Sequence, residues 1–309
     1  YRTRYSALPE YKGIRTVFTI HNIQYQGIFD FDRHGDLFNI PGDAAYLAEF
    51  NGTLNLMKGA IEAADRVSTV SPTYAEEILY AYYAHGLEGI LSRNRGKLSG
   101  ILNGIDVVRY DPMTDKALTH PFSARTPAQK VKNKLDLQKD LGLPVDKDIP
   151  MIGIISRLVS HKGLDLILRV IHDILHLPLQ FVVLGTGDAE YENALTNIRE
   201  QYPDKMSVTI DFNSALASRI YGASDIILMP SQSEPCGLVQ MVACRYGAAP
   251  IVRRTGGLRD SVFDASLGGN GFTFDNYNAH EMLSAIERAV ALYKDKKEWR
   301  TLLVRTLKC

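Results

Sequence analysis

Cysteine is scarce in this sequence. The 309 residues include only three, Cys236, Cys244 and Cys309. Their spacing matches no metal-binding pattern, and an odd number does not suggest a framework of disulfide bonds. We therefore expect a protein of a reducing compartment, without a cysteine-based metal site.

The sequence also lacks an excess of charge and a long apolar run. Lys and Arg together number 35, as do Asp and Glu. This balance produces no overall field that would attract nucleic acid or a membrane surface. No apolar run reaches the ~18 residues of a membrane-spanning helix. We therefore expect neither nucleic acid nor membrane as a partner.

The first residues, Tyr1-Arg-Thr-Arg-Tyr5, include neither an initiator methionine nor the apolar core of a signal peptide. We therefore expect the chain to begin inside a longer protein, from which a targeting segment could be missing.

What the sequence does contain is a regular alternation of strands and helices from residue 151 onward. Strands are predicted at residues 151–155, 180–184, 207–210, 225–230 and 271–274. Another strand is predicted to begin at Ala249 and to end in a glycine loop within residues 249–258. Helices are predicted at residues 164–176, 189–201, 214–223, 238–246 and 279–294. Strands that alternate with helices of this length predict a parallel, doubly wound α/β sheet.

The earlier part of the chain shows a weaker version of the same pattern. Strands are predicted at residues 15–20, 66–70 and 97–102, and helices at residues 43–64, 72–82 and 131–141. Residues 109–150 are poor in strand signal and rich in Asp, Lys, Pro and Thr. They predict a connection between two domains, which we place at residues 1–148 and 149–309.

The loop after the strand at residues 225–230 holds the first candidate site residue. It reads Ser231-Gln-Ser-Glu-Pro-Cys-Gly-Leu-Val-Gln240 and holds the carboxylate of Glu234 between a strand and a helix. Ligands of open α/β sheets bind at that edge, and helix N-termini favour phosphate there. A second loop, Thr255-Gly256-Gly257, follows the next strand and offers backbone N–H groups to a phosphate. Two such loops predict one polyanionic ligand with a carboxylate beside it.

Two cations and a glycine follow earlier strands of the same predicted sheet. Arg157 and Lys162 occupy one strand-to-helix loop, and such a pair suits a diphosphate. Taken alone, the pair is more often a solvated basic loop. Gly185 lies in Gly185-Thr-Gly187, and a short Gly-x-Gly after a strand forms a plain turn as often as it contacts phosphate. Because all these loops follow strands of one sheet, together they favour a nucleotide-diphosphate site.

Polar residues also follow the strands of the first domain. His21 comes directly after the strand at residues 15–20, and Asn103 follows the strand at residues 97–102. For His21, a capping His-Asn pair is as good an interpretation as a site residue. For Asn103, a structural Asn-Gly turn is as good an interpretation as a ligand contact. Asp30-Phe-Asp32 matches a pattern that holds a divalent metal in other nucleotide-sugar enzymes. We expect no metal, because Arg157 and Lys162 already supply charge for a diphosphate.

Five motifs resemble those of the glycogen and starch synthases, in that family's order and spacing. They are His21-Asn-Ile-Gln-Tyr-Gln-Gly27, Ile101-Leu-Asn-Gly-Ile-Asp106, Ser156-Arg-Leu-Val-Ser-His-Lys-Gly163, Glu234-Pro-Cys-Gly-Leu238 and Arg254-Thr-Gly-Gly-Leu258. The resemblance implies a GT-B fold, in which two Rossmann-like domains face each other across a cleft. It also implies retaining transfer of glucose from a nucleoside diphosphate to the end of an α-1,4-glucan such as glycogen or starch.

The resemblance implies roles for individual residues. Arg157 and Lys162 match the pair that neutralises the departing diphosphate. Glu234 matches the carboxylate that holds the transferred glucose and steadies the positive charge on its ring. His21 matches a histidine that reaches the donor sugar, and Asn103 a neighbouring polar contact. The backbone groups that match donors to phosphate and sugar are those of Gly237, Leu238, Thr255, Gly256 and Gly257.

The resemblance also bears on donor and acceptor. Many retaining GT-B enzymes with lipid or small-molecule acceptors carry a second Glu eight residues after the first, whereas this sequence has Val242 there. That favours a glucan acceptor. Residues 240–247 resemble bacterial members, which favours ADP-glucose over UDP-glucose and a cytoplasmic location, or a plastid if the source is a plant. A GT-B enzyme with a small acceptor and an inactive nucleotide- or glucan-binding fragment remain the alternatives.

Two departures from the family pattern bear on completeness. The family's opening Lys-x-Gly-Gly-Leu loop is absent, and the chain stops at Thr306-Leu-Lys-Cys309, where family members continue into a further helix. The resemblance therefore implies that the N-terminal domain is incomplete. We expect a chain truncated at both ends that could be inactive alone.

Overall fold

The computed structural model describes residues 1–308. The chain forms two compact units, which are Tyr1–Asn103 (unit 1) and Gly104–Cys309 (unit 2). Cys309, the third cysteine of the sequence, lies outside the described residues, whereas Cys236 and Cys244 are buried in unit 2.

Unit 2 is built on a parallel sheet of six strands in the order β12-β11-β10-β7-β8-β9. The strands are β7 (Met151–Ile155), β8 (Gln180–Leu184), β9 (Met206–Thr209), β10 (Ile226–Met229), β11 (Ala249–Arg253) and β12 (Phe272–Phe274). The helices are α5 (Lys130–Asp140), α6 (Leu164–His176), α7 (Ala189–Gln201), α8 (Ser214–Ala223), α9 (Val239–Arg245), α10 (Gly256–Ser261), α11 (Ala279–Lys294) and α12 (Lys296–Thr306). Short 3-10 turns lie at Pro127–Gln129, Ser160–Lys162 and Ala265–Leu267.

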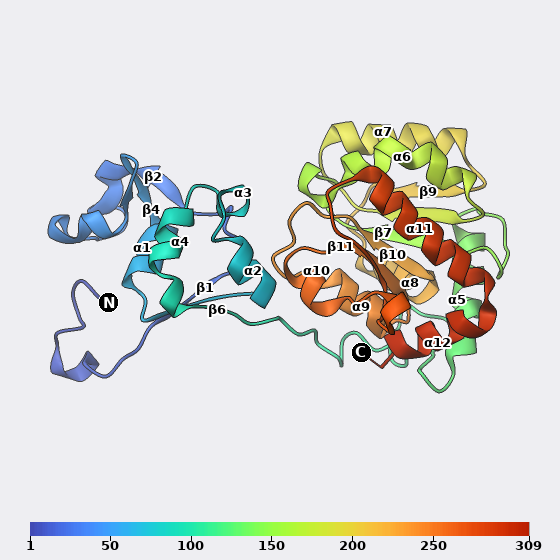
Figure 1. The fold of residues 1–309 in the computed structure, drawn as a ribbon, viewed down its shortest axis with the longest axis horizontal. Coiled ribbons are helices and arrows are strands. Elements are labelled where there is room, and N and C mark those ends of the chain that lie inside the picture. Colours follow the sequence, from blue (N-terminus) through green and yellow to red (C-terminus); the bar gives the residue numbers. More distant parts are fainter. Residues whose placement is uncertain (309) are drawn as a thin grey trace. The chain divides into compact units, whose positions relative to one another are not determined.

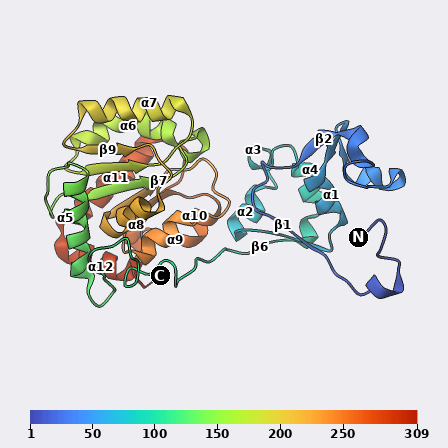
Figure 2. The ribbon, with the colours of Figure 1, turned by 180° about the vertical axis from the view of Figure 1, so that it is seen from behind.

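Helices cover both faces of this sheet, as Figures 1 and 2 show. Successive strand residues point to opposite faces, so Phe181 and Val183 of β8 pack against α6, α7 and α11. Val182 and Leu184 of the same strand pack against α5, α8 and α9. Burial on both faces explains why the strands read as continuous apolar runs. The predicted doubly wound parallel sheet is confirmed in unit 2.

The predicted elements of unit 2 agree closely with the structure. β7, β8, α6, α7, α8 and α11 begin and end where the sequence predicted them. The main element that the sequence did not predict is α12, where the side chain of Asp295 accepts hydrogen bonds from the N–H groups of Lys297 and Glu298.

The division between the units falls after Asn103, whereas composition suggested residue 148. Residues 104–148 belong to unit 2, and their principal contact with the rest of that unit is that of α5 with α8. The Nζ of Lys130, in α5, donates to the carbonyl oxygens of Tyr221, Gly222 and Tyr246 at 2.9, 3.1 and 2.8 Å. Composition suggested a polar connection between domains, but the buried side chain of Lys130 joins this segment to the rest of unit 2.

Unit 1 contains a three-stranded parallel sheet, β1-β5-β6, and a three-stranded antiparallel sheet, β2-β4-β3. The strands are β1 (Val17–Ile20), β2 (Ile28–Asp30), β3 (Glu49–Phe50), β4 (Thr53–Asn55), β5 (Arg66–Thr69) and β6 (Leu98–Gly100). The helices are α1 (Leu56–Ala63), α2 (Pro72–Glu77), α3 (Ala81–Ala84) and α4 (Glu88–Arg93). Short 3-10 turns lie at Pro9–Tyr11, Phe31–His34, Gly42–Leu47 and Arg95–Lys97.

The helix predicted at residues 43–64 was wrong over most of its length. Only α1 is an α-helix, and β3 and β4 form a hairpin before it. Asn51 and Gly52 join the two strands with φ values of 53° and 78°. An Asn-Gly pair adopts positive φ readily and favours a two-residue hairpin turn. This turn signal overrode the helical spacing of the apolar residues.

The helix predicted at residues 72–82 begins as expected but ends early. The side chain of Ser71 caps α2 by accepting a hydrogen bond of 2.9 Å from the N–H of Tyr74. α2 ends at Glu77, and the N–H groups of Leu79 and Tyr80 then bond three residues back, to Glu76 and Glu77. The tightened turn separates α2 from α3.

Candidate functional site

The strand order of unit 2 contains one reversal, between β10 and β7, which pair with each other. Strands that follow β7 in sequence, β8 and β9, lie on one side of this point, and β10, β11 and β12 lie on the other. The loops after β7 and β10 therefore leave the sheet in opposite directions and open a crevice at their carboxyl ends. Crevices at such a reversal are where open α/β sheets bind their ligands.

The predicted residues lie on both sides of this crevice. Arg157 and Lys162 follow β7, and Glu234 follows β10. The Nζ of Lys162 donates to Oε2 of Glu234 at 2.7 Å. The hydroxyl of Ser231 donates to the same oxygen at 3.0 Å. Glu234 is only 7% exposed, so its carboxylate is largely shielded from water. The two donors that bind it come from different loops.

A cavity of about 210 Å³ adjoins the pair. Its wall combines the end of β7, the two loops and the start of α9. The lining residues are Ile155, Ser156, Arg157, Lys162, Leu228, Met229, Ser231, Glu234, Gly237, Leu238 and Val239. The sequence-predicted residues Arg157, Lys162, Glu234, Gly237 and Leu238 are thus brought to one cavity.

A larger cavity of about 530 Å³ lies next to it in the same unit. The two cavities share Ile155, Ser156 and Arg157 as lining residues. The predicted residue Gly185 lines the larger one, as does Phe212, whose side chain is 94% exposed. Sequence analysis missed Phe212, although an aromatic residue in a loop directly after a predicted strand was a usable signal.

Thr255, Gly256 and Gly257 lie beneath the loop that carries Glu234. Thr255 is fully buried, and the N–H of Gly257 donates to the carbonyl oxygens of Glu234 and Pro235 at 3.1 and 3.2 Å. Gly256 has φ of 43°, and a Cβ there would lie 2.0 Å from the carbonyl oxygen of Glu234. The geometry therefore gives Gly256 and Gly257 a supporting role, and their contact with a ligand stays a prediction.

The β7–α6 loop has a positive local field. Burial, reinforced by the neighbouring cations Lys162 and Arg157, lowers the pKa of His161. Burial is the larger cause of this shift in pKa, and the two cations of the loop add to it. The loop is therefore suited to an anion.

His21 and Asn103 belong to unit 1, where both are exposed. His21 follows the carboxyl end of β1, and Asn103 lies three residues after the end of β6. The loop after His21 is braced from within, because the N–H of Ile23 donates to the buried hydroxyl of Tyr74 at 3.1 Å. Their predicted contact with a donor sugar stays a prediction.

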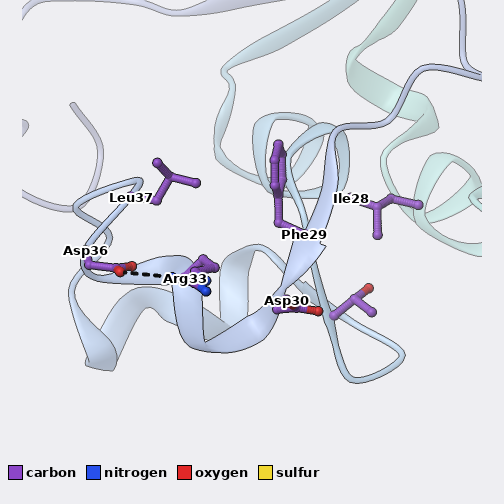
Figure 3. Close-up of a pocket in the computed structure, with 7 residues that line it drawn as sticks. Ile28, Phe29, Asp30, Arg33, Asp36 and Leu37 are labelled. Atoms are coloured by element: carbon purple, nitrogen blue, oxygen red, sulfur yellow. Dashed lines mark ion pairs between the residues drawn. The ribbon is translucent and has the colours of Figure 1, made fainter.

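Unit 1 has a cavity of about 530 Å³ beside β2 (Figure 3). It is lined by Asp30, Arg33 and Asp36 together with Ile28, Phe29, Leu37 and Thr53. Arg33 lies 3.5 Å from Asp36, in the ion pair that Figure 3 marks with a dashed line, and 3.7 Å from Asp32. Across residues 1–308, no group of three or more His, Cys, Asp or Glu side chains is arranged to hold a metal ion.

Two family models match the chain. Residues 1–93 match the starch synthase catalytic domain, and residues 138–301 match the glycosyl transferases group 1. The two models fall in unit 1 and unit 2, respectively.

Curated relatives extend this similarity over nearly the whole chain. The chain is 47% identical to a glycogen synthase of Clostridioides difficile over 316 aligned residues, covering 99% of this chain and 65% of the relative. It is 51% identical to a glycogen synthase of Clostridium acetobutylicum, covering 94% of this chain and 62% of the relative. The chain therefore spans less than two thirds of the length of these relatives.

One solved structure matches the whole described fold. It is the catalytic domain of starch synthase IV from Arabidopsis thaliana bound to ADP and acarbose. The TM-score is 0.90 at 37% identity, and the match covers 100% of this chain and 66% of the other. The resemblance to glycogen and starch synthases and the expected GT-B fold are confirmed. In the described part of the chain, no helix has the length and apolar character needed to cross a membrane.

Proposed function

Because the chain belongs to the glycosyl transferases group 1 and its first 93 residues match the starch synthase catalytic domain, we propose that it supplies the donor site of an α-1,4-glucan synthase. The proposed reaction transfers glucose from ADP-glucose to the non-reducing end of glycogen or starch, with retention of configuration. The observation that carries this proposal is the Lys162–Glu234 pair beside Arg157, at the strand-order reversal of a Rossmann-like sheet.

The smaller cavity suits the diphosphate and the transferred glucose. Arg157 and Lys162 supply two positive charges where the leaving diphosphate gains negative charge, and such preorganised charges are usually the largest electrostatic contribution to catalysis. Glu234 lies at hydrogen-bonding distance from Lys162 and can stabilise positive charge on the sugar ring. Because these cations are already present, we propose that transfer needs no metal ion.

The larger cavity suits the nucleoside. It shares Arg157 with the smaller cavity, so a ligand can extend from one to the other past this residue. The exposed ring of Phe212 offers a face on which a base can stack, and the larger purine ring system gains more from stacking than uracil does. The starch synthase IV structure that this chain resembles is bound to ADP. Both points support ADP-glucose as the donor.

The relatives support proposals for the acceptor and the location. The matched structure is bound to acarbose, and the curated relatives are named glycogen synthases. We therefore propose an α-glucan acceptor and a bacterial cytoplasmic location. His21 and Asn103, in unit 1, are the proposed contacts to the sugar, by their resemblance to family positions.

Calorimetric titration with ADP and UDP tests the donor site directly. We expect ADP to bind more tightly than UDP, and Lys162→Ala to weaken ADP binding at least about 10-fold through loss of a charge-assisted contact. Lys297→Ala is the matched control, since Lys297 is exposed on α12. Folded protein that binds neither nucleotide, or a Lys162→Ala variant that binds ADP like the wild type, would contradict the proposal.

Transfer of labelled glucose separates the acceptor classes. We expect incorporation from ADP-glucose into glycogen, persisting in the presence of EDTA. Transfer to free monosaccharides in preference to glycogen would instead indicate a small-acceptor enzyme.

A further inference from the structure

A buried guanidinium lies directly behind the loop that carries Glu234. Arg253 is the last residue of β11 and is only 7% exposed. Its Nε donates to the carbonyl oxygen of Ser231 at 3.0 Å, and a terminal nitrogen donates to the carbonyl oxygen of Gln232. One side chain therefore holds two consecutive carbonyl groups at the start of the β10–α9 loop.

These two anchored residues control both members of the Lys162–Glu234 pair. The hydroxyl of Ser231 donates to Glu234, so a shift of Ser231 moves a direct partner of the carboxylate. The N–H of Gln232 donates at 2.9 Å to the carbonyl oxygen of His161, the residue before Lys162. A displacement of residues 231–232 would thus reach both loops at the crevice.

Arg253 is held in turn by the segment after β12. The ring of Tyr277 lies 5.9 Å from the guanidinium carbon, within the range of a cation–π contact. The hydroxyl of Tyr277 donates to Asp165, in the first turn of α6. These contacts run in a series from Asp165 through Tyr277, Arg253, Ser231 and Glu234 to Lys162. The chain itself connects the two ends of the series, because Asp165 follows Lys162 by three residues.

We propose that Arg253 is a positioning residue that fixes the distance between Lys162 and Glu234, with Tyr277 and Asp165 as its support. The inference rests on the proposed glucosyl transfer for its kinetic consequence. The shape of the guanidinium is the essential feature, because its planar fork spans two carbonyl groups that an ammonium on a flexible stem cannot hold in the same way. Charge alone does not replace it.

Two substitutions separate shape from charge. Arg253→Lys keeps the charge and loses the fork, whereas Arg253→Gln loses both. The matched control is Arg288→Gln, because Arg288 in α11 also holds a backbone carbonyl, that of Thr273 at 2.7 Å, and pairs with Asp264 at 2.9 Å. That contact lies on β12, away from the Glu234 loop, so the control reports the general effect of losing such an arginine.

The first readout is amide hydrogen exchange, which does not depend on activity. We expect faster exchange at Gln232 and Gly257 in both Arg253 variants, with unchanged exchange in α7 and α11. Arg288→Gln should leave Gln232 and Gly257 unaffected. Equal exchange at these two amides in wild type and both variants would overturn the proposal.

The second readout divides turnover from binding. Misplacement of a reacting group by about 1 Å costs about 10²-fold in rate, so we expect kcat to fall by that factor in Arg253→Lys, with ADP affinity within about 3-fold of wild type. A Lys variant with wild-type kcat would overturn the role assigned to the fork. The wild-type chain could instead transfer no glucose while both Arg253 variants exchange faster than it at Gln232. That result would overturn the proposed function and would still support the positioning role of Arg253.

Discussion

Lys162 Nζ and Glu234 Oε2 lie 2.7 Å apart although 72 positions separate the residues in the chain. Lys162 reaches the crevice from the loop after β7, and Glu234 from the loop after β10. The two strands pair in the sheet, so the fold rather than the local sequence places the charges together. The predictions below depend on this pair and on the elements around it.

The coupling between the two charges is measurable in a double-mutant cycle. Lys162→Met leaves a buried carboxylate with one partner fewer, which should cost about 1–3 kcal/mol of unfolding free energy. Glu234→Gln should cost less, and the double variant less than the sum of the single variants, with a coupling of about 0.5–3 kcal/mol. Urea unfolding measures all four proteins. If the effects of the two single substitutions add up to that of the double variant, the interaction between Lys162 and Glu234 contributes nothing to stability.

Glu234→Gln should separate binding from turnover. The substitution removes a negative charge beside the diphosphate site, so ADP binding should be kept or strengthened. Loss of the carboxylate should lower kcat about 10²–10³-fold, the usual effect of removing one preorganised electrostatic group. Calorimetry and labelled-glucose transfer measure the two effects. The control is Glu287→Gln, on the exposed side of α11, and turnover by Glu234→Gln equal to that control would remove Glu234 from the mechanism.

Gly256→Ala should damage the site more than an ordinary glycine substitution. A Cβ at Gly256 would lie 2.0 Å from the carbonyl oxygen of Glu234, in addition to the cost of φ at 43°. Gly268→Ala is the matched control, because φ there is 81° and nothing lies within 4 Å of the added carbon. The control should lose about 1–2 kcal/mol from positive φ alone. Gly256→Ala should lose more and should also lose transfer activity; equal unfolding free energies would show that the loop adapts.

Phe212→Ala should weaken nucleotide binding without affecting the fold. Its ring is 94% exposed on the wall of the larger cavity. Base stacking on an aromatic side chain contributes about 1–3 kcal/mol, which corresponds to about 5- to 150-fold in ADP affinity. Leu267→Ala removes an apolar side chain that is 89% exposed elsewhere and serves as the control. Identical ADP affinities in the two variants would place the base elsewhere.

Lys130 should make stability depend on pH. Burial lowers its pKa from 10.5 to about 7, so between these values the unfolded chain binds a proton that the folded chain releases. Where the unfolded state binds more protons, stability rises with pH. The free energy of unfolding therefore has its full value, as far as Lys130 is concerned, above pH 10.5, and it decreases as the pH falls towards 7.

Comparison with Lys130→Met isolates this effect from all other titrations. The variant should be less stable throughout, because three buried carbonyl groups lose their donor. The difference in unfolding free energy between wild type and variant should increase from pH 7 to pH 10 in urea titrations. A constant difference would mean that the three carbonyl groups keep Lys130 charged across this range.

The sequence by itself determined most of unit 2 and the identity of its charged site residues. Strands such as β8 are continuous apolar runs because both faces of a parallel sheet are covered, and α6 and α11 carry helical apolar spacing between loop signals. Arg157, Lys162 and Glu234 stand just after such strands, so their position at the sheet edge followed from local pattern. These features depend on near neighbours in the chain, which a single sequence displays.

Tertiary structure decided what depends on distant residues. Lys130 and Tyr246 are 116 positions apart, and no local pattern reveals that their contact joins residues 104–148 to the rest of unit 2. Arg253 supports the Glu234 loop across a neighbouring strand, and Gly257 directs its N–H to that loop. The hairpin at Asn51-Gly52 prevailed over helical spacing because paired strands stabilise a turn that spacing alone does not show. The chain specifies the charges of this site, and the packing of the sheet and its loops sets the distances between them.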